Sequence, residues 1–162
     1  MNESSRVLVI DDEESIRRTI SMTLSHAGYV VDTAESGKEA LEKAAKSFYN
    51  LALIDIRLPD MEGTELLTAL GDATPRMMKV ILTGFPGLQN AVTAINKGVD
   101  AYLVKPVDTN ELLRVIKRLL EKQKGEREYS EAKVTEYLET RFKQLQTEEL
   151  DETTNGKNQP PP

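Results

Sequence analysis

Residues 51–63, Leu-Ala-Leu-Ile-Asp-Ile-Arg-Leu-Pro-Asp-Met-Glu-Gly, decide the fold of this protein. A short, continuous apolar run is typical of a strand that is buried on both faces of a parallel sheet, and Pro59 and Gly63 mark the loop that follows it. Asp55 then lies at the carboxyl end of the strand, which is the edge of an open parallel sheet where ligands bind. An aspartate can also cap a helix or a turn, so the rest of the chain has to decide its role.

Strands and helices alternate along the chain on both sides of this run. Besides the run that ends at Asp55, the predicted strands are Arg6–Ile10, Tyr29–Thr33, Met77–Leu82 and Ala101–Val104. The predicted helices are Ser15–Ala27, Ser36–Ser47, Gly63–Leu70, Leu88–Lys97 and one that begins near Asp108. Right-handed crossovers turn such an alternation into a parallel sheet covered on both faces, so we predict a doubly wound α/β domain.

Composition limits the classes of protein that are compatible with the chain. It has 162 residues and no cysteine, which excludes disulfides and thiolate metal sites. The net charge is −6, and residues 125–162 hold 5 basic and 9 acidic side chains. Neither this segment nor residues 1–124 has the basic surplus of a nucleic-acid binder. The sequence shows neither an export signal nor a membrane span, and we expect a cytoplasmic protein.

The last predicted helix continues beyond the domain. Apolar residues resume a helical spacing between Val134 and Leu145, after a charged segment around Gly125. A hinge at Gly125 would give a separate helix, whereas one long helix would tolerate the glycine at a cost of about 1 kcal/mol; we favour the long helix. We expect one globular domain at 1–124, a helical extension at 125–150 and a disordered tail at 151–162. The apolar stripe of the extension suits a partner helix, or it folds back on its own domain.

The strand ends carry residues that can bind phosphate or metal. Asp11 and Asp12 follow the first strand, Asp55 the third, Thr83 the fourth and Lys105 the fifth. Three carboxylates at one sheet edge repel one another unless a cation joins them, and a hard ion with oxygen ligands such as Mg²⁺ suits them. Asp55 can then act as the nucleophile of a phosphoryl transfer, with Mg²⁺, Lys105 and Thr83 neutralising the phosphoryl oxygens.

These residues, taken in order, resemble the receiver domain of two-component response regulators. The resemblance covers about residues 5–124 and is carried by four stretches, Val7–Glu13, Leu53–Gly63, Ile81–Gly84 and Ala101–Pro106. It implies a flavodoxin-like five-stranded sheet of order 2-1-3-4-5 with five helices. It also implies that Asp55 accepts a phosphoryl group from the phosphohistidine of a sensor kinase or a histidine phosphotransfer protein.

The resemblance also implies roles for the surrounding residues. Asp12, Asp55 and the Arg57 carbonyl ligate Mg²⁺, and Asp11 acts mostly through water. Thr83 and Tyr102 form the switch pair, in which the hydroxyl turns toward the phosphate and the ring rotates inward. The Lys105-Pro106 peptide bond is expected to be cis. Partners are expected to read the face made by the fourth helix, fifth strand and fifth helix.

Two residues are expected to set the lifetime of the phosphate. Arg57 and Phe85 lie two residues past Asp55 and Thr83, and a long cationic chain and a bulky apolar one shield the phosphate from water. We therefore predict slow autodephosphorylation.

The leading hypothesis is a phosphorylation-controlled interaction switch or phosphorelay intermediate. Such a protein is not an enzyme with multiple turnover. A homodimer through the fifth helix and the extension is one expected assembly. The alternatives are a transcription regulator that acts on DNA directly or through a partner, and an aspartate-nucleophile phosphatase.

Overall fold

A computed structural model of the chain describes residues 4–71, 76–84 and 87–155. Within them the elements alternate as β1 (Arg6–Ile10), α1 (Glu14–His26), β2 (Val30–Ala34), α2 (Gly37–Lys46), β3 (Leu51–Ile54), α3 (Gly63–Gly71), β4 (Met78–Thr83), α4 (Leu88–Asn96), β5 (Ala101–Val104) and α5 (Thr109–Asn155). Apart from the end of α5, the predicted boundaries agree with these to within one or two residues. Gly28 and Gly98, predicted to end helices, both have positive φ, a conformation that glycine adopts without strain.

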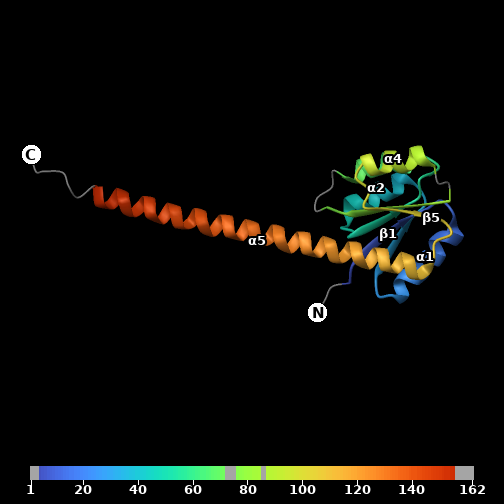
Figure 1. The fold of residues 1–162 in the computed structure, drawn as a ribbon, viewed down its shortest axis with the longest axis horizontal. Helices are drawn as coiled ribbons and strands as arrows, with labels where there is room; N and C mark the ends of the chain where they lie inside the picture. The colour runs from blue at the N-terminus through green and yellow to red at the C-terminus, as the bar shows by residue number, and fades with distance from the viewer. Residues whose placement is uncertain (1–3, 72–75, 85–86, 156–162) are drawn as a thin grey trace, which may run out of the picture. The chain divides into compact units, whose positions relative to one another are not determined.

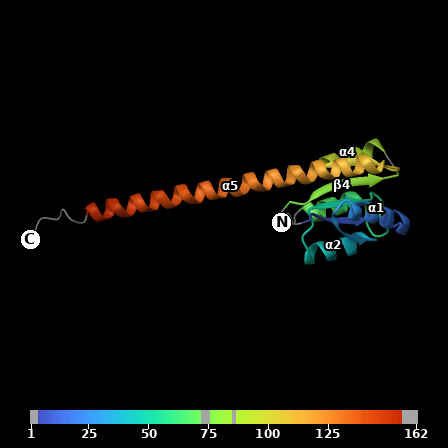
Figure 2. The same cartoon turned by 90° about the horizontal axis from the view of Figure 1, so that it is seen from below.

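The five strands form one parallel sheet of order β2-β1-β3-β4-β5, which confirms the predicted fold class. Helices cover both sides of the sheet, with α1 and the start of α5 on one side and α2 and α4 on the other (Figure 1; Figure 2 gives the perpendicular view). The pairing is in register across the middle of the sheet, where Ile10 lies beside Ile54 and Ile54 beside Ile81. The carboxyl ends of β1, β3 and β4 therefore lie at the same edge.

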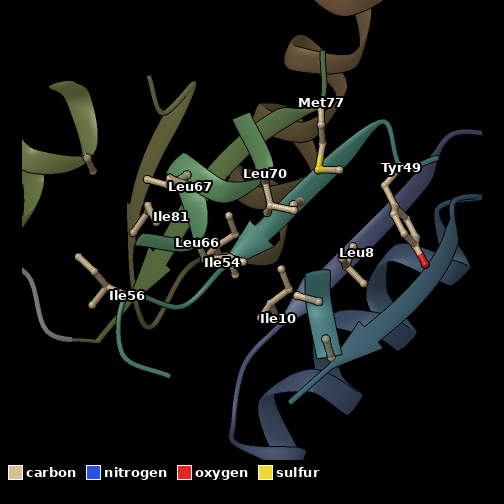
Figure 3. Close-up of a cluster of buried hydrophobic side chains, with 14 residues drawn as sticks. Leu8, Ile10, Tyr49, Ile54, Ile56, Leu66, Leu67, Leu70, Met77 and Ile81 are labelled. Carbon is tan, nitrogen blue, oxygen red and sulfur yellow. The ribbon is translucent and has the colours of Figure 1, made fainter. Parts of the chain in front are cut away.

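The side chains of the inner strands alternate between two cores. Leu8 and Ile10 of β1 belong to the core under α2, α3 and α4, which Figure 3 shows in close-up. Val7 and Val9 belong to the core under α1 and α5, which Leu24 and Ile116 complete. Because both faces are covered, every residue of β3 and β4 is buried, including the polar Lys79 and Thr83 of β4.

The chain forms two compact units, residues 1–123 and 124–162. Helix α5 supplies the last helix of the first unit and continues as the described part of the second. The predicted helix through Gly125 is present. The predicted start of a disordered tail at residue 151 is wrong for residues 151–155, which continue α5 to Asn155; none of these five is glycine or proline, and the first helix breaker is Gly156. Residues 156–162 lie outside the described residues.

Candidate functional site: an acidic cluster at the sheet edge

The candidate site lies where four parallel strands end. The ladder continues one residue past the strands, because the Asp55 amide donates to the Ile10 carbonyl at 3.0 Å. The Lys105 amide likewise donates to the Thr83 carbonyl at 2.8 Å. These bonds fix Asp55 beside the end of β1, and Lys105 beside the end of β4. Residues that are as many as 94 positions apart in sequence are thereby brought to one edge.

The Lys105 ammonium joins two of the carboxylates. Its Nζ donates to Asp11 Oδ2 at 2.5 Å and to Asp55 Oδ2 at 3.3 Å. Both aspartates are buried, and Lys105 is half-buried. The Lys105-Pro106 peptide bond is cis, as predicted. Charge-assisted hydrogen bonds of this kind are shorter and stronger than neutral ones.

Asp11, Asp12 and Asp55 bring a carboxylate oxygen each within 4.8 Å of one another. The Asp11 carboxylate also accepts from the Glu13 amide at 2.9 Å, and that of Asp55 from the Arg57 amide at 3.3 Å. Asp12 is exposed to solvent. Three carboxylate oxygens, one of them open to water, are the donor set that a hard divalent cation prefers.

The electrostatics of the cluster are unbalanced. Burial raises the pKa of the Asp55 carboxyl above its usual value, the charge of Asp11 raises it further, and Lys105 only partly opposes this. Burial by itself would lower the pKa of the Lys105 ammonium, but its hydrogen bonds and ion pairs with Asp11 and Asp55 outweigh burial and raise it. The Lys105 ammonium contacts two of the three clustered carboxylates, so further positive charge would stabilise the ionised cluster.

The two residues predicted to form a switch lie on neighbouring strands. Thr83 is fully buried at the end of β4. Tyr102 of β5 pairs with Ile81, and its ring packs against the core under α2, α3 and α4. Its hydroxyl is buried without a hydrogen-bond partner among the described residues. Arg57 is exposed in the loop after Asp55, and Phe85 lies outside the described residues.

The structure adds residues that sequence reasoning missed. The Arg17 guanidinium of α1 donates to the Asp11 carbonyl at 2.6 Å and so supports the loop after β1. Asp60, in the loop after Asp55, accepts from the amides of Gly37 and Lys38 at the start of α2. A Cβ on Gly63 would lie 2.3 Å from the Asp55 carbonyl oxygen, so the start of α3 packs directly on the Asp55 backbone. Only Gly63 carried a sequence signal, and that signal indicated a turn.

Comparison with known proteins identifies the family. Residues 7–117 match the response regulator receiver domain, and this chain belongs to that family. The uncharacterized transcriptional regulatory protein YkoG of Bacillus subtilis is 33% identical over 118 residues, which are 73% of this chain and 52% of that protein. The chain spans about half the length of the curated relatives it matches first.

Solved structures of the same family match closely. A CheY-like receiver domain protein from Methanospirillum hungatei has a TM-score of 0.75 and 43% identity, over 76% of this chain and 99% of that one. A response regulator from Burkholderia pseudomallei, which carries a phosphorylated aspartic acid, a calcium ion and citrate, has a TM-score of 0.67 and 30% identity, over 76% of this chain and 73% of that one. Among the described residues, no helix combines the length and apolarity needed to span a membrane.

Proposed function

We propose that this receiver is a cytoplasmic protein that accepts a phosphoryl group on Asp55 from the phosphohistidine of a sensor histidine kinase or histidine phosphotransfer protein. The observation that carries the proposal is the position of the Asp55 carboxylate, buried at the sheet edge beside Lys105 and within 4.8 Å of two other carboxylates. The phosphorylated aspartic acid and calcium ion in the related Burkholderia pseudomallei protein support the same chemistry.

The transfer needs a nucleophile and positive charge. An Asp55 oxygen attacks phosphorus, the phosphorus–nitrogen bond breaks, and its electron pair returns to the imidazole ring of the donor. Lys105 and the Thr83 hydroxyl hold the phosphoryl oxygens. Mg²⁺, when bound, supplies the remaining positive charge on those oxygens. Asp12, Asp55 and the Arg57 carbonyl would hold this ion directly, and Asp11 through water.

The phosphodonor docks beside this site. A groove of about 420 Å³ runs between α1 and the loop after β5, lined by Ser15, Ile16, Thr19, Ile20, Leu82, Lys105, Pro106 and Val107. Lys105 is common to the groove and the acidic cluster, so a donor seated on the apolar lining has its histidine near Asp55. Apolar grooves with a few polar groups are the usual form of such recognition sites.

Phosphorylation is read on the face made by α4, β5 and α5. A phosphate adds about −1.5 to −2 charge, which draws Thr83 and Lys105 and biases the inward position of Tyr102. Val92, Ile95 and Val104 are exposed apolar residues of α4 and β5, and they offer a contact surface to a downstream protein. We assign phosphate acceptance to residues 1–124 and partner binding in part to the extension at 125–150.

The decisive experiment is stoichiometric modification. Acetyl phosphate with Mg²⁺ should add one phosphoryl group to the wild type, measured by intact mass spectrometry, and beryllofluoride should occupy the same site. Asp55→Ala should abolish both, whereas Glu62→Gln, an exposed change in the same loop, should leave them unchanged. Modification that persists in Asp55→Ala refutes the assignment.

Two alternative functions, transcription regulation and phosphatase activity, can each be distinguished from the proposed switch by its own measurement. Regulation of transcription is favoured by the name of the Bacillus subtilis relative, and salt-dependent binding of the purified chain to a specific DNA would establish direct action. Without such binding, transcription would be reached only through a partner. An aspartate-nucleophile phosphatase would hydrolyse a phosphomonoester over many turnovers, whereas the proposed switch is modified once per molecule.

A further inference from the structure

The second unit of the chain exposes an apolar stripe on α5. The extension stripe consists of five residues, Val134, Tyr137, Leu138, Phe142 and Leu145, which are between 45% and 68% exposed. Val134, Leu138, Phe142 and Leu145 recur every three or four residues and Tyr137 adjoins Leu138, which places all five on one side of the helix. No described residue covers them, and a helix with an uncovered apolar side is stabilised by packing against a second helix.

The charges beside the extension stripe are complementary when two copies of the helix run in opposite directions. On the same side of the helix, Arg127 and Glu131 precede the stripe, Arg141 lies within it, and Glu149 follows it. In a parallel, in-register pair, each of these would face its own copy, so every facing pair would have like charge. In an antiparallel pair, Arg127 before the stripe of one helix faces Glu149 after the stripe of the other.

We propose that the extension pairs with that of a second copy of this chain as an antiparallel helix dimer. Leu138 faces its own copy across the two-fold axis, and Val134 of each helix packs against Phe142 of the other. The same register places Arg127 opposite Glu149, and Glu131 within one turn of Arg141 of the second copy. Each pair occurs twice because the interface is isologous. The pairing does not depend on phosphorylation of Asp55.

Disulfide trapping tests the orientation, because the chain has no cysteine of its own. Val134→Cys and Phe142→Cys variants are mixed at tens of micromolar under mild oxidation. The mixture should form a reducible dimer that contains both variants. Each variant alone should form little, because the two copies of one position lie about 12 Å apart along the helix axis, eight residues at ~1.5 Å each. A disulfide needs Cα atoms within about 7 Å.

The possible outcomes decide the proposal. Efficient cross-linking of Val134→Cys with itself would establish a parallel pair and overturn the antiparallel arrangement. A lack of cross-linking in the mixture, with a monomeric mass for the cysteine-free chain by light scattering, would overturn the dimer. Leu138→Glu should abolish the mixed cross-link, whereas Glu136→Gln, on the opposite side of the helix, should retain it.

A second inference concerns Asp60 and rests on the hydrogen bonds that join the loop after Asp55 to α2, independently of the extension stripe. The loop that carries Arg57 is bonded internally, by the Leu58 amide to the Met61 carbonyl and by a bridge between Arg57 and Glu62. Its tip is attached to α2, because the Asp60 carboxylate accepts from the Gly37 amide at 2.9 Å and from the Lys38 amide at 2.8 Å. These two amides hold the pKa of the Asp60 carboxyl below its usual value.

We infer that Asp60 is a positioning residue for the proposed cation, since the loop it attaches carries the Arg57 carbonyl. This inference rests on the proposed Mg²⁺ site. Asp60→Ala should weaken Mg²⁺ binding on the order of tenfold, measured by titration calorimetry well below the melting temperature, as losses of supporting contacts around metals do. Asp60→Asn, which keeps one acceptor oxygen, should lie between Asp60→Ala and the wild type.

A variant on the other partner separates this role from a general loss of stability. Lys38→Pro lies in the first turn of α2, removes one amide donor to Asp60 and changes nothing in the loop. It should reproduce part of the Mg²⁺ loss, whereas Lys38→Ala, which keeps the donor, should bind as the wild type does. Unchanged affinity in Asp60→Ala overturns the inference, and a wild type that binds no Mg²⁺ overturns the proposed site instead.

Discussion

Replacing Gly63 by alanine tests how closely α3 packs on the phosphoacceptor. The added Cβ would lie 2.3 Å from the Asp55 carbonyl oxygen and 2.8 Å from the Ile56 Cα, whereas ordinary contacts begin at 3.4 Å. Both neighbours are backbone atoms, so α3 and the end of β3 must separate by about 1 Å. Overpacking of this kind costs about 1–3 kcal/mol. The shift also strains the 2.7 Å hydrogen bond from the Gly63 amide to the Ile56 carbonyl.

Urea unfolding measures this cost. With a slope of about 1–3 kcal/mol per molar urea, the midpoint of Gly63→Ala should fall by roughly 1 M. Gly71→Ala is the matched control at the other end of α3, because the one described contact of its Cβ would be the flexible Lys79 ammonium at an ordinary 3.4 Å. Labelling of Asp55 by acetyl phosphate should slow in Gly63→Ala and not in Gly71→Ala. Equal midpoints for Gly63→Ala and wild type would refute the close approach.

Three further predictions follow from single groups. Asp55→Asn should raise the melting temperature of the Mg²⁺-free protein at neutral pH, because the raised pKa of Asp55 means that its ionised form destabilises the fold. This increase in melting temperature should shrink as the pH falls through that pKa and the wild-type carboxyl becomes protonated. Gly125→Ala, with open space around the new Cβ, should increase the helicity measured by circular dichroism and stabilise α5 by about 0.5–1 kcal/mol; a loss of helicity would contradict a helical Gly125. Burial and the hydrogen bond to Asp32 raise the pKa of Tyr49 to about 12. The stability of the wild type should therefore fall more steeply than that of Tyr49→Phe as the pH rises from about 10 to 12. Urea midpoints of the two proteins that fall equally over this pH range would contradict the prediction.

The alternation of elements could be predicted because it depends on neighbours in the sequence. The short apolar run before Asp55 indicated a strand covered on both faces, and helical spacing with Gly28 and Gly98 at the ends delimited α1 and α4. Placing Asp55 and Lys105 at one edge needed no more than the rule that parallel strands share their carboxyl ends. The order of the strands in the sheet, by contrast, was predicted only from the resemblance of the motif residues to a family.

Contacts between loops could not be predicted, because they depend on distances that the sequence does not encode locally. Asp60 looks like any turn residue until α2 brings the Gly37 amide within 2.9 Å. Gln123 carries no recognisable pattern in its helix. Its side chain nevertheless donates to the carbonyls of Asn50 and Arg76, and so connects α5 to the segments that lead into β3 and β4.

Asp55 illustrates the division between sequence and structure. The sequence by itself determined that an aspartate ends a buried strand, since hydrophobic pattern and turn residues are local properties. Only the tertiary structure decided that Lys105 contacts both Asp11 and Asp55, and that Gly63 leaves no room beside the Asp55 carbonyl. Those features arise from strand register and helix packing, which bring together groups that are distant along the chain.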